Sequence, residues 1–349
     1  MRVLGALLLA ALALGAPLRA QAPADLPPAY EPRAQVSGTI TIWGHGSYGK
    51  QTDFVEGLTR VWQEGFIKHH PDVRFENRLH GTASAIGALY TGKGDLALMG
   101  REIWDPEIAA FAEVMGYPPT GVDVLTGSFD VRNKGYALVV FAHKDNPLTG
   151  LSLAQLDAVF GMRRLRGHPP VKTWGDLGLS DEWADKPVNL YGLPIARGFA
   201  DYFQEAVFLG SPFWNPSLRE FADSPGSKGG ATDGGQKMLN ALAQDRYGIG
   251  YAGLLYSHPD VKPIALAHGP GEPFVSPTEA TVRDRSYPLT RVITMFFNRR
   301  PGKPVDPKIA EFLRYILSRE GQEAVERHGG GYLPVIAPLA KIELKKLED

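Results

Sequence analysis

The residues with the clearest capacity for chemistry are small hydroxyl side chains, glycines and two arginines that stand where a strand ends or a helix begins. At the start of a helix the backbone N–H groups lack partners, and the helix dipole adds partial positive charge. Such turns can bind an oxyanion, and neighbouring hydroxyl and guanidinium groups can donate further hydrogen bonds to it. One turn of this kind is more often a plain helix cap, but several in one chain favour a shared anion site. The candidate ligand-binding residues are Gly46, Ser47, Thr82, Ala83, Ser84, Arg101, Arg197 and Gly198.

The turn at Arg197-Gly198, in "IARGFADYF" (195–203), is the most informative of these. Apolar residues follow it near helical spacing, so the pattern predicts a helix that begins here. Arg197 then either binds an anion at the helix N-terminus or lies on the surface without a role in binding. At the turn in "HGTASA" we expect Thr82 or Ser84 to cap the helix that follows.

The elements that must position these turns alternate between strand-like and helix-like segments from Gly38 onward. This alternation indicates an α/β architecture with largely parallel sheets. Ligands of such sheets bind beyond the carboxyl ends of the strands, where the candidate turns lie. The expected strands are 38–43, 72–79, 94–100, 135–143, 187–193, 247–255 and 291–298, and the expected helical segments are 52–70, 80–92 (a turn entering a short helix) and 306–329.

The first 22 residues have the pattern of a secretory signal peptide. Arg2 supplies a positive start, residues 3–16 form an apolar run, and "AQA" at 20–22 provides the small residues of a cleavage site. A buried N-terminal helix is the less favoured alternative. No later run approaches the roughly 18 apolar residues of a membrane span, so we expect export to the periplasm without membrane insertion.

Composition limits the classes of partner and of chemistry. The formal net charge is −1 at pH 7 without a basic tract, which argues against nucleic acid or a membrane surface as partner. The sequence contains no cysteine, which excludes disulfides, thiol chemistry and a cysteine lipid anchor. After a proline-rich leader or linker at 23–37, the chain is long enough for two domains stabilised by packing alone.

Several motifs occur in a fixed order along the chain: "HGTASAIGAL", "GDLALMGRE", "GYALVVFAHKDNPLTG", "YGIGYAGLLY" and a C-terminal run from "YPLTRVITMFF" to "GGGYLPV". With them, the chain from about Gly38 to Val335 resembles the periplasmic phosphate-binding proteins of ABC importers, the PstS-like type of the type II periplasmic binding protein superfamily. The resemblance implies two α/β lobes, each a mostly parallel sheet flanked by helices, joined by two crossover strands. Lobe one would comprise 38–133 with 281–349, and lobe two 134–280.

The same resemblance implies a function. The expected protein captures a small oxyanion, phosphate foremost, between its lobes and delivers it to an ABC permease and ATPase complex. It would act as a monomer, without catalysis, cofactor or metal. A hinged closure of the lobes on the ligand is the expected mechanism.

The helix entry in lobe two departs from the family pattern, which typically has an arginine, an acidic residue and a Ser-Gly-Thr run. Alignment on "ADYF" places Leu193 at the arginine and Ile195 at the acidic residue. The family's Ser-Gly-Thr run then aligns with Arg197, Gly198 and Phe199. A pocket carboxylate accepts a hydrogen bond from protonated phosphate and repels sulfate, so its loss predicts a pocket that tolerates sulfate.

In lobe one the pattern is better kept. "GTASA" retains a glycine followed by hydroxyl residues, which makes Thr82 and Ser84 the safer ligand candidates, while the alignment around Ser47 is weaker. Arg101 follows Gly100 at the end of an expected strand, where it is either an anion ligand or a solvated charge. Two arginines and several backbone N–H groups still favour an oxyanion.

Three alternatives stay open. A phosphate ester, a carboxylate or an aromatic organic ligand would suit a pocket lined by aromatic residues, unless these pack the core between the lobes. A sensor of the same fold, not coupled to transport, has the same sequence features. A periplasmic hydrolase is remote, because "HGSYG" lacks the first glycine of G-x-S-x-G and His69-His70 are expected to be a solvated helix end rather than metal ligands. The aromatic candidates are Tyr48, His80, Tyr191 and Phe199.

Overall fold

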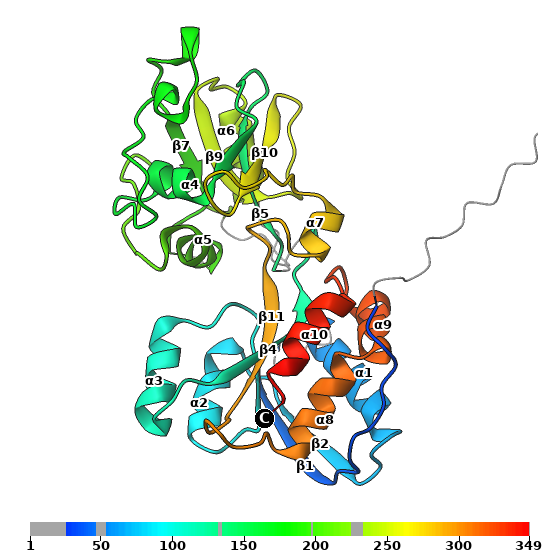
Figure 1. The fold of residues 1–349 in the computed structure, drawn as a ribbon. Helices are drawn as coiled ribbons and strands as arrows, with labels where there is room; N and C mark the ends of the chain where they lie inside the picture. The colour runs from blue at the N-terminus through cyan, green and yellow to red at the C-terminus, as the bar shows by residue number, and fades with distance from the viewer. Residues whose placement is uncertain (1–25, 47–53, 132–134, 197, 225–232, 349) are drawn as a thin grey trace, which may run out of the picture.

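The structure, a computed structural model, has two sheets, each flanked by helices (Figure 1). This confirms the α/β fold class. We call the part built on the five-stranded sheet lobe one and the part built on the six-stranded sheet lobe two. The expected signal peptide, Ser47, Tyr48 and Arg197 lie outside the described residues. The described residues are 26–46, 54–131, 135–196, 198–224 and 233–348.

The sheet of lobe one combines both ends of the chain, in the order β2-β1-β3-β11-β4. Strand β1 is parallel to β2 and β3, whereas β11 is antiparallel to β3 and β4. Alternate residues of β1 are buried, as expected for a strand with one face against the core. The strands are β1 (Gly38–Gly44), β2 (Val73–Arg78), β3 (Leu96–Leu98), β4 (Thr120–Thr126) and β11 (Val292–Phe297).

Helices cover both faces of this sheet (Figure 1). One face packs against α1, α8 and α9, whose apolar side chains form one cluster with β1, β4 and β11. The other face packs against α2 and α3 in a smaller cluster. The helices of lobe one are α1 (Phe54–Ile67), α2 (Ala85–Tyr90), α3 (Asp105–Met115), α8 (Pro307–Ile316), α9 (Arg319–His328) and α10 (Ala337–Lys345).

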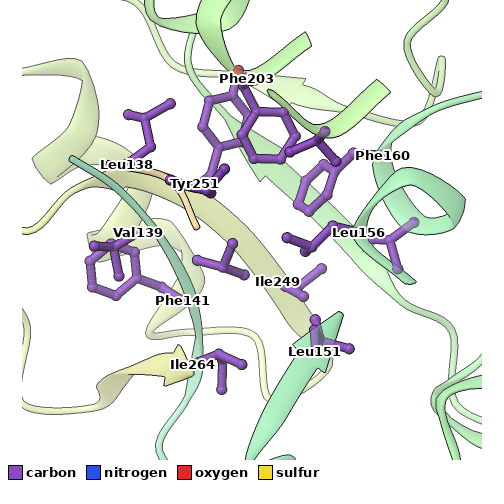
Figure 2. Packing of buried hydrophobic residues seen from close by; sticks show 14 of the residues in the cluster. Leu138, Val139, Phe141, Leu151, Leu156, Phe160, Phe203, Ile249, Tyr251 and Ile264 are labelled. Carbon is purple, nitrogen blue, oxygen red and sulfur yellow. The ribbon is translucent and has the colours of Figure 1, made fainter. Parts of the chain in front are cut away.

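Lobe two has the strand order β6-β10-β5-β9-β7-β8. Figure 2 shows its core, where Phe203 stacks on Tyr251 with ring centroids 4.3 Å apart and Phe160 meets both rings edge-on. The strands are β5 (Leu138–His143), β6 (Gly150–Ser152), β7 (Asn189–Gly192), β8 (Arg219–Glu220), β9 (Gly248–Gly253) and β10 (Val261–Ala267). The helices are α4 (Leu153–Phe160), α5 (Gly198–Phe208) and α6 (Gly234–Leu242), with α7 (Glu279–Arg283) on the return to lobe one.

Two strands connect the lobes. The chain crosses once between β4 and β5 and returns before β11, and Figure 1 shows β5 and β11 in the region where the lobes meet. Strand β5 is antiparallel to both of its neighbours, as is β11 in its own sheet. Each sheet is therefore parallel apart from the strand that follows a crossover. The expected mostly parallel lobes with two crossover strands are confirmed.

One expected helix proves to be two. The segment 306–329 is divided into α8 and α9, which are separated at Leu317 and Ser318. The Ser318 hydroxyl accepts a hydrogen bond from the N–H of Gly321 and begins the second helix. A side chain on Gly321 would meet the carbonyl oxygen of Ile316 at 2.2 Å, so the chain turns sharply here. Helical periodicity runs across the break, which hides it in the sequence.

The proline-rich leader is held against lobe one by Tyr30. The Tyr30 hydroxyl donates to Glu311 Oε2 at 2.7 Å and lies 2.7 Å from His70 Nε2. Its backbone N–H donates to Glu320. The expectation that His69-His70 form a solvated helix end is correct for His69, which is exposed, and wrong for His70, which is fully buried.

We predict that His70 makes the stability of the fold depend on pH. Burial lowers the pKa of His70, and its Nδ1 is buried without a hydrogen-bond partner. Because its pKa is lower in the folded state than the roughly 6.5 of an unfolded chain, the stabilisation is present above pH 6.5 and is lost as pH falls. The melting temperature of His70→Gln should therefore fall less between pH 7.5 and pH 5.5 than that of the wild type. The exposed neighbour gives the control: His69→Gln should keep the wild-type slope, and equal slopes in all three proteins would contradict the prediction.

Candidate ligand-binding site between the lobes

A cavity of about 390 Å³ lies between the lobes, and its lining residues come from both sheets. On the lobe-one side it reaches the residues that follow β1 and β3. On the lobe-two side it reaches the first turns of α5 and α6. The lining residues are His45, Gly100, Arg101, Gly135, Tyr136, Leu193, Pro194, Gly198, Phe199, Phe221, Asp223, Gly235, Tyr256, Arg291 and Tyr332. The cavity therefore lies beyond the carboxyl ends of parallel strands, as the sequence predicts.

On the lobe-one side, Thr82 contacts the residues that follow two strands, β1 and β3. Its hydroxyl accepts a hydrogen bond from the N–H of Gly100 at 3.1 Å, and its Oγ1 lies 3.2 Å from His45 Nδ1. A Cβ on Gly100 would lie 2.1 Å from His45 Nδ1, so only glycine leaves room for this imidazole. Thr82 thus stands behind the lining and fixes two residues that belong to it.

Three further lobe-one candidates also stand outside the lining, namely Ser84, Gly46 and Ala83. Ser84 donates its hydroxyl to the carbonyl of Gly81 at 2.8 Å, and Gly46 packs against Leu79. Ala83 is exposed in the same turn. The expectation that Thr82 or Ser84 caps the following helix is wrong: α2 has no side-chain cap, because both hydroxyls are engaged elsewhere.

Arg101 lines the cavity, but its charge is matched within lobe one. Its two terminal nitrogens each donate to Glu107 at 2.8 Å. The guanidinium also lies 3.4 Å from the centroid of the Trp104 ring. These contacts hold Arg101 at the cavity wall. Arg101 is therefore not the solvated charge at a strand end that was one of the two alternatives from the sequence.

Arg291, which the sequence reasoning missed, is the buried cation of the site. It precedes β11 and is only 5% exposed. Nε and Nη2 donate to the two carboxylate oxygens of Glu102 at 2.8 and 2.6 Å. Burial opposes the charge, but the carboxylate outweighs it and raises the pKa of Arg291. The guanidinium lies 5.2 Å from the ring centroid of Phe199 and 5.1 Å from that of Tyr202, so it joins a lobe-one carboxylate to the aromatic face of α5.

Aromatic rings form the lobe-two wall. Phe199 and Tyr136 are stacked with centroids 4.4 Å apart, and both line the cavity. Among the other aromatic candidates, Tyr191 instead donates its hydroxyl to Asp245 within lobe two, and His80 packs edge-on against Trp43. Of the described aromatic candidates, Phe199 alone lines the cavity.

Lobe two also contributes helix N-termini and a carboxylate. Gly198 and Gly235 lie in the first turns of α5 and α6, and both line the cavity. Asp223 lines it too, while its Oδ1 accepts hydrogen bonds from the N–H groups of Asp233 and Gly234 at 3.0 and 2.9 Å. The only sequence signal for Asp223 is an acidic residue shortly before a glycine-rich stretch, which reads equally well as a flexible loop.

The described part of the chain offers neither a cluster of metal ligands nor a membrane-spanning helix. Within it, no three His, Asp or Glu side chains are grouped so that they could hold a metal ion. Nor does any helix there combine the length and the apolar character needed to cross a membrane.

Comparison with known proteins places this geometry in a family. A profile for the PBP superfamily domain matches residues 35–320. The phosphate-binding protein PstS of Pseudomonas aeruginosa is 35% identical over 347 residues, which cover 99% of this chain and 98% of that protein. The protein of the same name from Staphylococcus aureus is 23% identical, covering 89% of this chain and 85% of that protein. The crystal structure of PstS from Borrelia burgdorferi aligns with a TM-score of 0.53 at 14% identity, covering 85% of this chain and 99% of that one. The chain belongs to the PBP superfamily and, within it, to the family of PstS-like binding proteins.

Proposed function

We propose that this protein binds inorganic phosphate between its lobes in the periplasm and delivers it to an ABC permease and ATPase complex. The observation that carries this proposal is an inter-lobe cavity that combines a buried arginine with two helix N-termini. It occurs in a chain that is 35% identical, over nearly its whole length, to a protein named for phosphate binding.

The chemistry of the lining suits a phosphate ion. Arg291 can donate from the nitrogen that Glu102 does not engage, and the first turns of α5 and α6 present backbone N–H groups. Asp223 can accept a hydrogen bond from the oxygen that is still protonated on phosphate at neutral pH. Because Arg101 and Arg291 are already balanced by carboxylates, we propose that Arg197 adds the remaining positive charge.

Closure of the lobes belongs to the proposal. A cavity of about 390 Å³ is large enough for an organic molecule, so a single phosphate is enclosed only when the lobes approach each other. We propose that lobe one comprises 38–133 with 281–349 and that lobe two comprises 134–280. We further propose that residues 1–22 are removed on export and that the mature protein is a monomer without enzymatic activity.

The deciding experiment is a ligand titration of the purified mature protein. Phosphate, sulfate, a phosphate ester and a small aromatic carboxylate are added while the melting temperature is followed. A ligand at 100 times its Kd stabilises the folded state by about 2.7 kcal/mol, which is readily measured. We expect phosphate to give the largest shift. A larger response to the ester or the carboxylate would overturn the proposed ligand, and no response to any oxyanion would overturn the anion site.

We predict that Arg197→Ala weakens phosphate binding by about 10- to 100-fold, which corresponds to one or two charge-assisted hydrogen bonds. Calorimetric titration measures the change. Arg327→Ala is the matched control, because Arg327 is exposed on α9 and its contact with Glu323 at 3.3 Å is a surface pair. Equal affinities of the two variants would show that Arg197 takes no part in binding.

A further inference from the structure

Lobe two carries an apolar patch that the ligand site does not use. Its members stand on the loop after α4 and the loop after α5, and each is about half exposed (48% to 54%). The loops are joined where the N–H of Met162 donates to the carbonyl of Phe213 at 2.9 Å. Arg166 of the first loop also donates to the carbonyl of Val207, near the end of α5, at 2.7 Å. The patch consists of Met162, Leu165, Leu209 and Phe213.

The backbone of these loops is held in a costly conformation. Arg164 and Leu209 have φ angles of 51° and 53°, in the left-handed region that side chains other than glycine avoid. Among the described residues only two other non-glycine positions, Asp181 and Arg285, share this property. A strained loop that presents a leucine to solvent gains no stability from doing so. Strain and exposed apolar side chains together are typical of a surface kept for recognition.

The surroundings of the patch are cationic. Beside it lies a groove of about 630 Å³, to which Met162 contributes together with Arg164, Lys172 and Arg219. None of the described residues that line this groove is acidic. The guanidinium of Arg163 lies 4.5 Å from the centroid of the Phe213 ring, within the patch itself. Since the whole chain has a net charge of −1, this concentration of positive charge is local.

The patch also borders the cleft. Phe213 and the exposed Ile195 line one small hollow. The residue that follows, Ala196, lines the space between the lobes together with Gly198. The patch therefore belongs to lobe two but reaches the cleft rim, so its position relative to lobe one changes when the lobes close. A partner that contacts both can distinguish the closed form from the open form.

We propose that this patch is a docking surface for a protein that presents an apolar side chain flanked by carboxylates. Met162 and Phe213 receive the apolar side chain, and Arg163, Arg164 and Lys172 face the carboxylates. This proposal rests on the proposed function, from which the partner is the periplasmic face of the importer's permease.

The test measures binding to the permease and ATPase complex encoded in the same genome, held in lipid nanodiscs. The double variant Met162→Ser/Phe213→Ser removes the apolar centre, and Arg163→Glu reverses a charge without touching the core. We expect both to weaken binding to the complex at least 10-fold while phosphate affinity stays within twofold of wild type. Ile342→Ser is the control, because Ile342 is equally exposed but lies on α10 of lobe one. It should bind the complex like the wild type.

Each contrary outcome is informative. If the patch variants bind the complex as the wild type does, or if the wild type does not bind it, the docking surface is overturned. Loss of a concentration-dependent dimer in the variants, seen by light scattering, would likewise overturn it in favour of a second copy of this chain. The phosphate titration is independent of these readouts. A wild type that docks through the patch but does not bind phosphate would refute the proposed function and leave the docking surface supported.

Discussion

Replacing Arg291 with methionine is expected to lower phosphate affinity about 100-fold and to destabilise the fold by about 3 kcal/mol. The affinity falls because the buried cation of the cavity is lost. The stability falls because Glu102, whose side chain is only 22% exposed, keeps its negative charge but loses the ion pair with Arg291. Calorimetric titration measures the first effect and urea denaturation the second.

The double variant Arg291→Met/Glu102→Gln separates the two effects. Removal of the unbalanced carboxylate should restore much of the stability, since a neutral pair is far cheaper to bury than a lone charge. It should not restore phosphate binding, because the donor is still absent. If affinity recovers together with stability, Arg291 only supports the fold and is not a ligand.

Arg283→Met provides the matched control. Arg283 also precedes β11, at the end of α7, and pairs with a glutamate, Glu326, at 2.7 Å, but both side chains are about one-third exposed. Exposed pairs contribute little, so the loss should stay below about 1 kcal/mol with unchanged phosphate affinity. A similar loss of affinity in this variant would point to a general weakening of the crossover segment rather than to a binding role.

The sequence predicts those residues of the site whose position depends on nearby residues in the chain, namely residues at helix starts and strand ends. Strand ends and helix starts can be predicted from periodicity, which places Gly198 at the start of α5 and Arg101 shortly after the end of β3. Both line the cavity. The conformation of a turn can be anticipated in this way because it depends on neighbours in the chain.

The remaining lining residues depend on contacts between distant segments. Arg291 is brought to the cavity by a crossover strand, and its partner Glu102 lies 189 residues earlier. Tyr136 reaches Phe199 only because the chain enters lobe two beside α5. The hydroxyl of Thr82 likewise does not cap the helix that follows, because it accepts a hydrogen bond from the N–H of Gly100, which is distant in sequence. Periodicity carries no information about such pairs, since each residue type is ordinary in its own segment.

Asp223→Asn is expected to exchange phosphate selectivity for sulfate tolerance. In the wild type, we expect the carboxylate to accept a hydrogen bond from protonated phosphate and to repel sulfate, so that phosphate binds at least 100-fold more tightly. In the variant, phosphate affinity should fall about 10-fold and sulfate affinity should rise, leaving them within about 10-fold of each other. The amide oxygen can still accept from Asp233 and Gly234, so α6 should begin as before. Competition calorimetry with both anions measures the ratio.

This experiment also decides between two arguments about the same pocket. The hydrophobic Ile195 at the family's acidic position predicts that the wild type already tolerates sulfate, whereas Asp223 in the lining predicts that it does not. Asp201→Asn is the control, because this substitution also removes one negative charge from lobe two. Asp201 stands on α5 and lines the neighbouring inter-lobe space rather than the cavity. If Asp223 accepts a hydrogen bond from protonated phosphate, only its replacement should allow sulfate to bind. The discriminating carboxylate would then stand before α6 in this protein, rather than before α5 as in the family pattern. A wild type that binds both anions equally would leave Asp223 with the structural task of starting α6 and nothing more.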